Sequence, residues 1–510
     1  MTSSQVVPIN TAPDGATNHE QPAGIDPGEI IVAPAELSLP VEGMIPITDD
    51  VVVSTEGDPA APMTQRRVLG LAVPIIGENF LQTMVGAVDT FMVAKLGAAA
   101  VAGVGASVEL VFFLISILSA VDIGATVLVS QAIGSGDTAR ANRLARQAVV
   151  WGLVLAVPIS VLGFLGAPAV VSVFGTEPAV AEAATTYVKI TSALSVALLL
   201  SFVCGAILRG AGDSKTPFKA AMLANAVNIV VAYSLIFGKF GLPELGVAGS
   251  AYGAAAGRAV GATVMLILMV GGKRVVSLAG REGWKPNLGT AKELFRLGIP
   301  AALEQMLMSG GFTTMMVVVA MIGTAALAAQ QIAFTALSLA FMPGFGFAIA
   351  ATALVGQSIG ARNIEHAKQA QRIALKWGIV WMSVGGVLYF ALASQVLNFF
   401  VADAGVHDAG VSALHAISLS LPFWAVWSVC GGALRGTGDT RTPMIIGTLA
   451  VWLAVAIAWI GVRNFGFDLG NVWMTFMITA PLAGICNWVF LNRRLKLPIE
   501  QMGRATAAAH

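Results

Sequence analysis

The chain has 510 residues, of which 56% are hydrophobic and only 11% are charged. Soluble domains carry about 25% charged residues, so this composition excludes a soluble globular enzyme. The apolar content excludes disorder for most of the chain, and three cysteines in this length exclude a disulfide scaffold. The sequence therefore predicts a polytopic membrane protein.

Residues 1–65 differ from the rest of the chain. They contain ten acidic residues and no Lys or Arg, and they are rich in Pro, Ala and Gly. No basic segment precedes an apolar run, so they do not resemble a signal peptide. We expect a disordered acidic tail in the cytoplasm. The remaining residues then carry 29 basic and 18 acidic side chains.

From Val68 onward, apolar stretches of about 20 residues or more recur, each long enough to cross a bilayer core of ~30 Å as a helix. We predict an all-α protein with twelve transmembrane helices. The predicted spans are 68–94, 99–128, 144–167, 180–207, 217–238, 247–271, 293–319, 325–354, 370–399, 410–433, 443–462 and 470–492.

The basic residues predict the orientation of these helices. If both termini lie in the cytoplasm, 24 Lys and Arg residues flank the spans on that side, and four lie on the other. Arg258 falls within a span. Because cytoplasmic loops are enriched in Lys and Arg, this bias supports two cytoplasmic termini and an even number of helices. We expect the protein in the cytoplasmic (plasma) membrane.

The two halves of the chain resemble each other. The segment VCGAILRGAGDSKTP (203–217) matches VCGGALRGTGDTRTP (429–443), and SQAIGSGD (130–137) matches GQSIGARN (356–363), always at an offset of 226 residues. A constant offset indicates a duplicated six-helix unit. We predict an N-lobe at 66–272, a cytoplasmic linker at 273–292, a C-lobe at 293–495 and a cytoplasmic tail at 496–510.

Because six is an even number, both units enter the membrane from the same side. The two repeats are then parallel and related by an axis along the membrane normal, a plan that transporters use with the substrate cavity between the halves.

These segments, together with VDTFMVAKLG (88–97) and NIVVAYSLIFG (228–238), resemble the multidrug and toxic compound extrusion (MATE) transporters, in the bacterial branch that includes DinF-like proteins. The resemblance covers about 66–495. It implies two lobes around a central cavity and export of amphipathic, often cationic, compounds in exchange for H⁺ or Na⁺. It implies a monomer in membrane lipid that is not an enzyme, with no nucleic-acid partner and no metal or cofactor besides the coupling ion.

Acidic residues within the spans are costly, at ~2.5–3.5 kcal/mol each, and therefore need a reason. Glu78, Gln82 and Asp89 fall on one stripe of the first predicted helix, because eleven residues make almost three turns. Asp89 also matches the first-helix aspartate of the family, which implies a role in ion coupling. The alternative is a helix-packing hydrogen bond.

Two asparagines follow on the fifth predicted helix. Asn225 and Asn228 lie three residues apart on one face. Asn228 matches a family asparagine, whereas Ala232 stands where some relatives have an aspartate. We expect Asp89 to work with Asn225, Asn228 and Glu109. Interhelical hydrogen bonding is the alternative role of the asparagines.

The second half offers fewer acids. Glu304 is the repeat partner of Glu78, and the tenth predicted helix, 410–433, contains no acid where sodium-coupled relatives have one. This favours H⁺ over Na⁺. Residues proposed for the substrate cavity are Glu109, Glu304, Met308, Gln330 and Trp424, although Met and Trp at helical spacing more often belong to a core.

Two further expectations concern the ends of the helices and the substrate. Arg209 could pair with Asp213, and Arg435 with Asp439, to latch the lobes on the cytoplasmic side. The alternative function is a flippase for lipid-linked oligosaccharides, which has the same two-lobe architecture. A pyrophosphate substrate needs cations in the cavity, and Arg258 is the single basic residue well inside a predicted span.

Overall fold

The computed structural model describes residues 63–172, 177–272, 274–400 and 403–498. Nearly all of the predicted acidic tail and most of the predicted C-terminal tail lie outside these residues. The helices of the described part are α1 (Gln65–Ala94), α2 (Ala98–Gly134), α3 (Thr138–Ser172), α4 (Pro178–Ala193), α5 (Ser195–Gly210), α6 (Lys215–Ile236), α7 (Val247–Val270), α8 (Leu288–Ala320), α9 (Thr324–Gly360), α10 (Ile364–Phe400), α11 (Ala404–Gly436), α12 (Arg441–Phe465), α13 (Leu469–Met474) and α14 (Phe476–Arg494).

The predicted all-α class with many membrane spans is confirmed. Among the described residues, ten segments are long and apolar enough to cross a membrane, and the bent pair α4–α5 makes an eleventh. The predicted span 325–354 falls within α9, a helix of 37 residues. Most helices run past the predicted spans because their ends continue through polar residues; α3, for example, begins at Thr138, well before the predicted 144. The exceptions are α6 and α7, which end at Ile236 and Val270, before the predicted 238 and 271.

Two predicted spans are interrupted: 470–492 consists of α13 and α14, with Thr475 between them, and the other is more strongly bent. The segment 180–207 consists of α4 and α5, which meet at Leu194 with a bend of 54°. The Ser160 hydroxyl of α3 donates hydrogen bonds to the carbonyls of Ser192 (2.7 Å) and Ala193 (3.1 Å) at the bend. A broken helix is tolerated inside a membrane where neighbouring side chains satisfy the freed backbone groups, so Ser160 explains the break.

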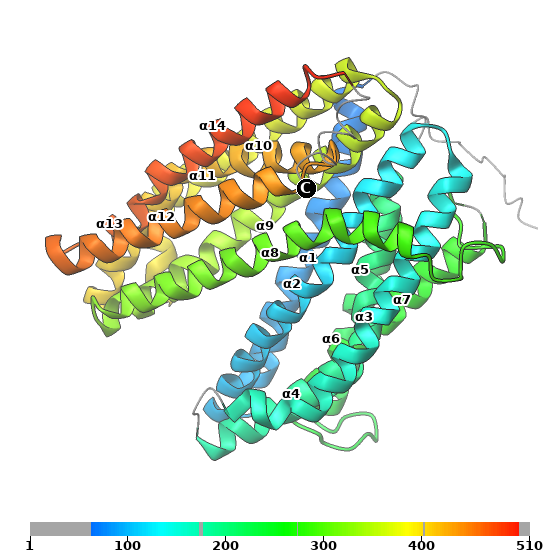
Figure 1. The fold of residues 1–510 in the computed structure, drawn as a ribbon. Helices are drawn as coiled ribbons and strands as arrows, with labels where there is room; N and C mark the ends of the chain where they lie inside the picture. The colour runs from blue at the N-terminus through cyan, green and yellow to red at the C-terminus, as the bar shows by residue number, and fades with distance from the viewer. Residues whose placement is uncertain (1–62, 173–176, 273, 401–402, 499–510) are drawn as a thin grey trace, which may run out of the picture. The chain divides into compact units, whose positions relative to one another are not determined.

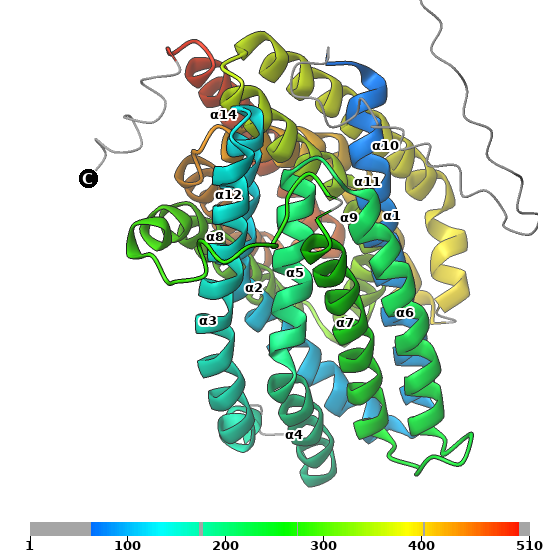
Figure 2. The same cartoon turned by 90° about the vertical axis from the view of Figure 1, so that its right-hand side faces the viewer.

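The helices of the described unit form two groups, which we call the N-lobe (α1–α7) and the C-lobe (α8–α14) (Figures 1 and 2). A core cluster containing Val121, Leu199 and Ile207 lies in the N-lobe, and one containing Ile417, Trp424 and Phe476 lies in the C-lobe. The lobes meet where α1 packs on α9 and α2 packs on α8 and α9.

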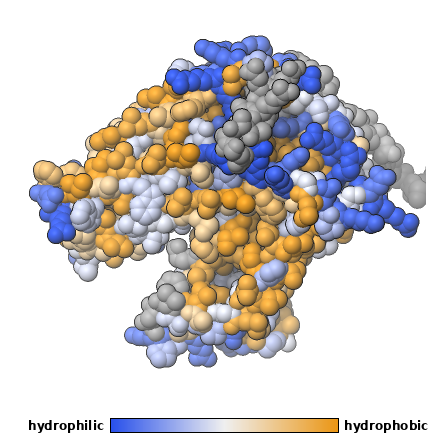
Figure 3. Space-filling view, in the orientation of Figure 1, coloured by the Kyte–Doolittle hydropathy of each residue, from blue (hydrophilic) through white to orange (hydrophobic). Residues whose placement is uncertain are grey.

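The surface matches a membrane environment. Large apolar side chains such as Leu162, Leu165 and Val387 are at least two-thirds exposed. Figure 3 shows apolar residues over the lengths of the helices and hydrophilic residues toward their ends. A monomeric soluble protein rarely exposes contiguous apolar area on this scale, so lipid is the solvent of these faces.

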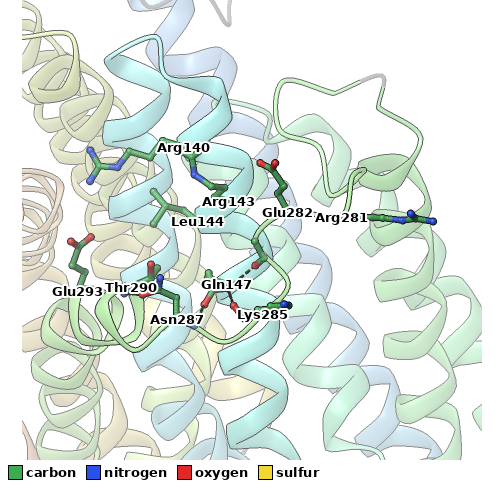
Figure 4. A pocket seen from close by; sticks show the side chains of 11 residues that line it. Arg140, Arg143, Leu144, Gln147, Arg281, Glu282, Lys285, Asn287, Thr290 and Glu293 are labelled. Carbon is green, nitrogen blue, oxygen red and sulfur yellow. Dashed lines mark hydrogen bonds between the residues drawn. The ribbon is translucent and has the colours of Figure 1, made fainter.

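The linker between the lobes is fastened to α3. The Arg146 guanidinium donates to the carbonyls of Leu278, Ala279 and Glu282. The Gln147 side chain donates to the carbonyls of Gly283 (2.6 Å) and Lys285 (2.7 Å). These bonds border a surface pocket of mixed charge, shown in Figure 4. The helix α8 then begins at Leu288, earlier than the predicted linker end at 292.

Candidate functional site

Asp89 on α1 faces α6 in the N-lobe. The amide of Asn228 donates a hydrogen bond of 3.1 Å to Asp89 Oδ2. Among the described residues, Asp89 Oδ1, Asn228 Oδ1 and Asn225 Nδ2 are buried without a hydrogen-bond partner. Arg258 on α7 lies close enough to interact electrostatically with Asp89. The structure thus brings Asp89 and Asn228 into contact, and both side chains retain a polar atom that can bind a further group.

Close packing of α6 against α7 leaves no room for an acid at position 232. Ala232 is completely buried. A Cβ atom built on Gly253 would come within 2.5 Å of Ala232 Cβ and 2.7 Å of its Cα, so the two backbones are already in contact. This geometry explains why the chain departs from the relatives that carry a carboxylate one turn after the asparagine.

Glu78 belongs to a different cluster from Asp89. Its carboxylate accepts hydrogen bonds of 3.2 and 3.3 Å from Arg209 of α5, and Arg209 also lies 3.6 Å from Asp122 of α2. Eleven residues along α1 correspond to about 16 Å. The predicted stripe is thus divided between an ion-paired end and the Asp89 end, and Gln82 between them is exposed.

The C-lobe contains the repeat of this pairing. Arg435 of α11 donates bonds of 2.7 Å to both carboxylate oxygens of Glu304 on α8. The Glu304 side chain is only 6% exposed. Glu78–Arg209 and Glu304–Arg435 are each separated by 131 residues, and the two pairs are related by the 226-residue offset. Glu304 is thus held by an ion pair within its own lobe.

The remaining predicted cavity residues lie in or beside the C-lobe core. Trp424 is 5% exposed and stacks on Trp427 with ring centroids 4.6 Å apart. Met308 packs against the same core cluster. Gln330 is buried, and its Oε1 has no hydrogen-bond partner in the described residues. The side chain of Glu109 lies outside the described part of the structure.

The predicted cytoplasmic latches do not form. Asp213 accepts bonds from the backbone N–H (2.9 Å) and hydroxyl (2.6 Å) of Thr216 instead of pairing with Arg209. Asp439 does the same with Thr442 and also contacts Arg494. An aspartate in this position satisfies free N–H groups at the start of a helix. These two aspartates therefore accept bonds from the first turns of α6 and α12, and they do not latch the lobes.

Two glutamines that the sequence analysis did not single out connect the lobes. Gln131 of α2 donates 3.1 Å to the carbonyl of Gly436, and Gln357 of α9 donates 2.9 Å to the carbonyl of Gly210. Both donors and both acceptors are related by the 226-residue offset. The bonds are therefore reciprocal, as expected for parallel repeats related by rotation. The sequence did contain a feature that identifies these residues, because both repeated motifs carry a glutamine at the same position.

Glycines allow the close contact around these bonds. A Cβ on Gly134 would overlap the backbone of Gln357, and a Cβ on Gly360 would overlap the backbone of Gln131. These two glycines are also repeat partners. The ends of α2 and α9 therefore approach each other backbone to backbone, which seals the interface between the lobes at this level.

Comparisons with known proteins agree with this arrangement. A family model described as MatE matches residues 74–234 and 300–460, one copy in each lobe. The chain is 32% identical over 415 residues to the "Probable multidrug resistance protein NorM" of Thermotoga maritima, which covers 81% of this chain and 89% of that protein. It is 29% identical to a protein of the same name from Rhizobium meliloti, over 88% of this chain and 97% of that one.

Among solved structures, a transporter of the MOP superfamily from Pyrococcus furiosus matches with a TM-score of 0.80 and 22% identity, over 86% of this chain and 97% of that chain. The family model recovers the duplication seen in the sequence, and the relatives span nearly the whole helical region. The chain belongs to the MATE family, and it is a membrane transporter rather than an enzyme.

Proposed function

We propose that the protein exports amphipathic, often cationic, compounds in exchange for protons, and that Asp89 is the coupling carboxylate. Na⁺ is the less favoured coupling ion. The names of the relatives from Thermotoga maritima and Rhizobium meliloti, both multidrug resistance proteins, support export of diverse compounds. The observation that carries the proposal is that Asp89, unlike three other acids of the helices, forms no ion pair among the described residues.

Asp89 differs from the other described acids of the transmembrane region. Glu78, Asp122 and Glu304 each contact an arginine within 3.6 Å. Asp89 has a hydrogen bond to neutral Asn228 and no ion pair among the described residues. A carboxylate that is not neutralised by a salt bridge can bind either a proton or a cationic ligand, because its negative charge attracts both.

Coupling then follows from competition at one group. The ionised Asp89 attracts a cationic substrate, and a proton that binds Asp89 removes this attraction and releases the substrate. Asn228 holds the carboxylate oriented, and protonation of Asp89 leaves the positive charge of nearby Arg258 without a carboxylate charge beside it. A cation therefore experiences weaker attraction and stronger repulsion after protonation.

The contact between the lobes fits alternating access with two cytoplasmic termini in the plasma membrane. The helix ends that meet at Gly134 and Gly360 are followed at once by the basic N-terminal turns of α3 and by the start of α10. Under the positive-inside rule these ends face the cytoplasm, so the structure is closed on that side. Rotation of one lobe against the other, as a monomer, would break the Gln131 and Gln357 bonds and open it.

The test is transport of a cationic dye by the purified protein in liposomes, with pH and Na⁺ gradients imposed separately. We expect a pH gradient alone to drive dye movement, and Asp89→Asn to abolish it. Asp408→Asn is the matched control because that side chain is 85% exposed, and it should transport like the wild type. Transport driven by Na⁺ alone, or coupled transport by Asp89→Asn, would refute the proposal.

The flippase alternative needs cationic groups free to bind a pyrophosphate. Arg209 and Arg435 are each occupied by carboxylates of their own lobe. Arg258 interacts with Asp89. Two phosphates would therefore meet one arginine, which lies near the carboxylate of Asp89, and this favours efflux of cations over a flippase.

A further inference from the structure

The ion pairs of the two lobes differ by one carboxylate. Glu78–Arg209 in the N-lobe repeats Glu304–Arg435 in the C-lobe. The N-lobe adds Asp122, which lies 3.6 Å from Arg209. The position 226 residues later is Ala348, a residue that cannot carry charge. The duplicated fold thus provides an internal comparison between one guanidinium with two carboxylates and one guanidinium with a single carboxylate.

In the N-lobe, which has the additional acid, the Glu–Arg distances are longer and the carboxylates are more exposed than in the C-lobe. Arg435 contacts Glu304 at 2.7 Å to both oxygens, and Glu304 is 6% exposed. Arg209 contacts Glu78 at 3.2 and 3.3 Å, and Glu78 and Asp122 are 22% and 23% exposed. Asp122 Oδ1, the atom 3.6 Å from Arg209, is buried and has no hydrogen-bond partner among the described residues. The N-lobe guanidinium is therefore divided between two acids and satisfies neither of them fully.

The additional carboxylate changes the net charge of the N-lobe cluster. With all groups ionised, the C-lobe pair is neutral and the N-lobe cluster of Glu78, Arg209 and Asp122 carries one net negative charge. An uncompensated charge is costly in a low-dielectric region, and two nearby carboxylates disfavour joint ionisation. We propose that the Glu78–Arg209–Asp122 cluster binds one proton and is a second proton-binding site of the N-lobe, separate from Asp89.

The charged groups that interact with Asp122 belong to the N-lobe: Arg209 from α5 and Glu78 from α1. From the C-lobe, α8 meets α2 here through the backbone of Leu294 and through Gly298. Arg296 lies between these two residues and is not among the charged groups that interact with Asp122. Gly205, one turn before Arg209, leaves the space in which the guanidinium lies, since a Cβ there would be 2.9 Å from Arg209 Nη1.

The location ties the bound proton to the interface between the lobes. Asp122 lies between Ala120 and Gly124 on α2. A Cβ on Gly298 would overlap the carbonyl of Ala120, and a Cβ on Gly124 would lie 2.5 Å from the carbonyl of Leu294. A motion that moves the lobes apart would separate α2 from α8 next to Asp122, and it would change how far the cluster is exposed to water.

The role of this proton in driving transport rests on the proposed function, but proton binding itself does not. Infrared difference spectroscopy of the purified protein in lipid nanodiscs, between mildly acidic and mildly alkaline pH, detects the C=O stretch of protonated carboxyls. We expect two titrating bands in the wild type. One should be absent in Asp89→Asn, and the other should be absent in both Asp122→Asn and Glu78→Gln, because either substitution leaves one acid per guanidinium.

Glu304→Gln is the matched control, since the neutral C-lobe pair holds no proton, and both bands should persist in it. Two independent substitutions keep the test decisive if one variant does not fold. A second band that persists in Asp122→Asn or in Glu78→Gln would overturn the proposal and leave the Asp89 coupling intact. Conversely, loss of that band together with coupled transport by Asp89→Asn would overturn the proposed function alone.

Discussion

At the residue scale, the arginines of the LRG motifs show what local sequence can and cannot predict. The expected partner of Arg209 was Asp213 of the same repeated motif. The structure pairs Arg209 with Glu78, 131 residues earlier, while Asp213 accepts bonds from the first turn of α6. Which distant helix an arginine faces depends on packing of the whole lobe, and no local pattern contains that information.

The two Glu–Arg pairs predict unequal stability effects. Removing one partner of a buried pair leaves an uncompensated charge, so Glu304→Gln should lower the free energy of unfolding by about 3 kcal/mol. Glu78→Gln should cost clearly less, because Asp122 remains beside Arg209. Denaturant titration of the detergent-solubilised protein measures both. Equal losses for the two variants would contradict the assignment of Asp122 to the Arg209 cluster.

At the element scale, the sequence predicted where the helices lie but not how they break or pack. Apolar runs are local signals, so most predicted spans fall within described helices. The spans 217–238 and 247–271 run past the ends of α6 and α7, and 180–207 and 470–492 each cross a break between two helices. The bend at Leu194 was missed because no proline or glycine marks it, and its stabilising partner, Ser160, comes from α3. The contact of Ala232 with Gly253 was likewise invisible, because two small residues give no hydropathy signal.

That contact predicts the effect of a single methyl group. Gly253→Ala forces α6 and α7 apart and should destabilise the protein by about 1–3 kcal/mol. Gly86→Ala on α1 is the matched control, since no atom lies within 4 Å of a Cβ there. It should remain within about 0.5 kcal/mol of the wild type. Thermal unfolding of the two variants, measured side by side, tests this prediction. Equal stability of Gly253→Ala and Gly86→Ala would show that α6 and α7 are less tightly packed than described.

At the scale of the whole molecule, the duplication was predictable and the interface between the lobes was not. A constant 226-residue offset identified two equivalent units from the sequence alone. The reciprocal bonds of Gln131 and Gln357 depend on how the units face each other, which the offset does not specify. The expected latches between the lobes were therefore charged pairs, whereas neutral amide side chains and glycine backbones form the contact at these ends of α2 and α9.

These bonds predict a conformational shift. Each is worth about 1 kcal/mol, so the double variant Gln131→Leu/Gln357→Leu should favour the cytoplasm-open state by about 2 kcal/mol, or roughly 30-fold. Spin labels introduced by Thr138→Cys and Glu365→Cys, with Cys486→Ser, report the separation of the lobes. We expect longer distances in the double variant and unchanged distances in Gln331→Leu, an exposed control. An unchanged distribution in the double variant would show that these bonds do not hold the lobes together.

The most direct test of the account is a count of protons at the moment of substrate binding. In a weakly buffered solution of the purified protein, a cationic substrate that competes with H⁺ for Asp89 must release protons in proportion to the sites it fills. We predict release by the wild type and by Asp122→Asn, and none by Asp89→Asn. Substrate binding without proton release in the wild type, or undiminished release in Asp89→Asn, would contradict coupling through this carboxylate.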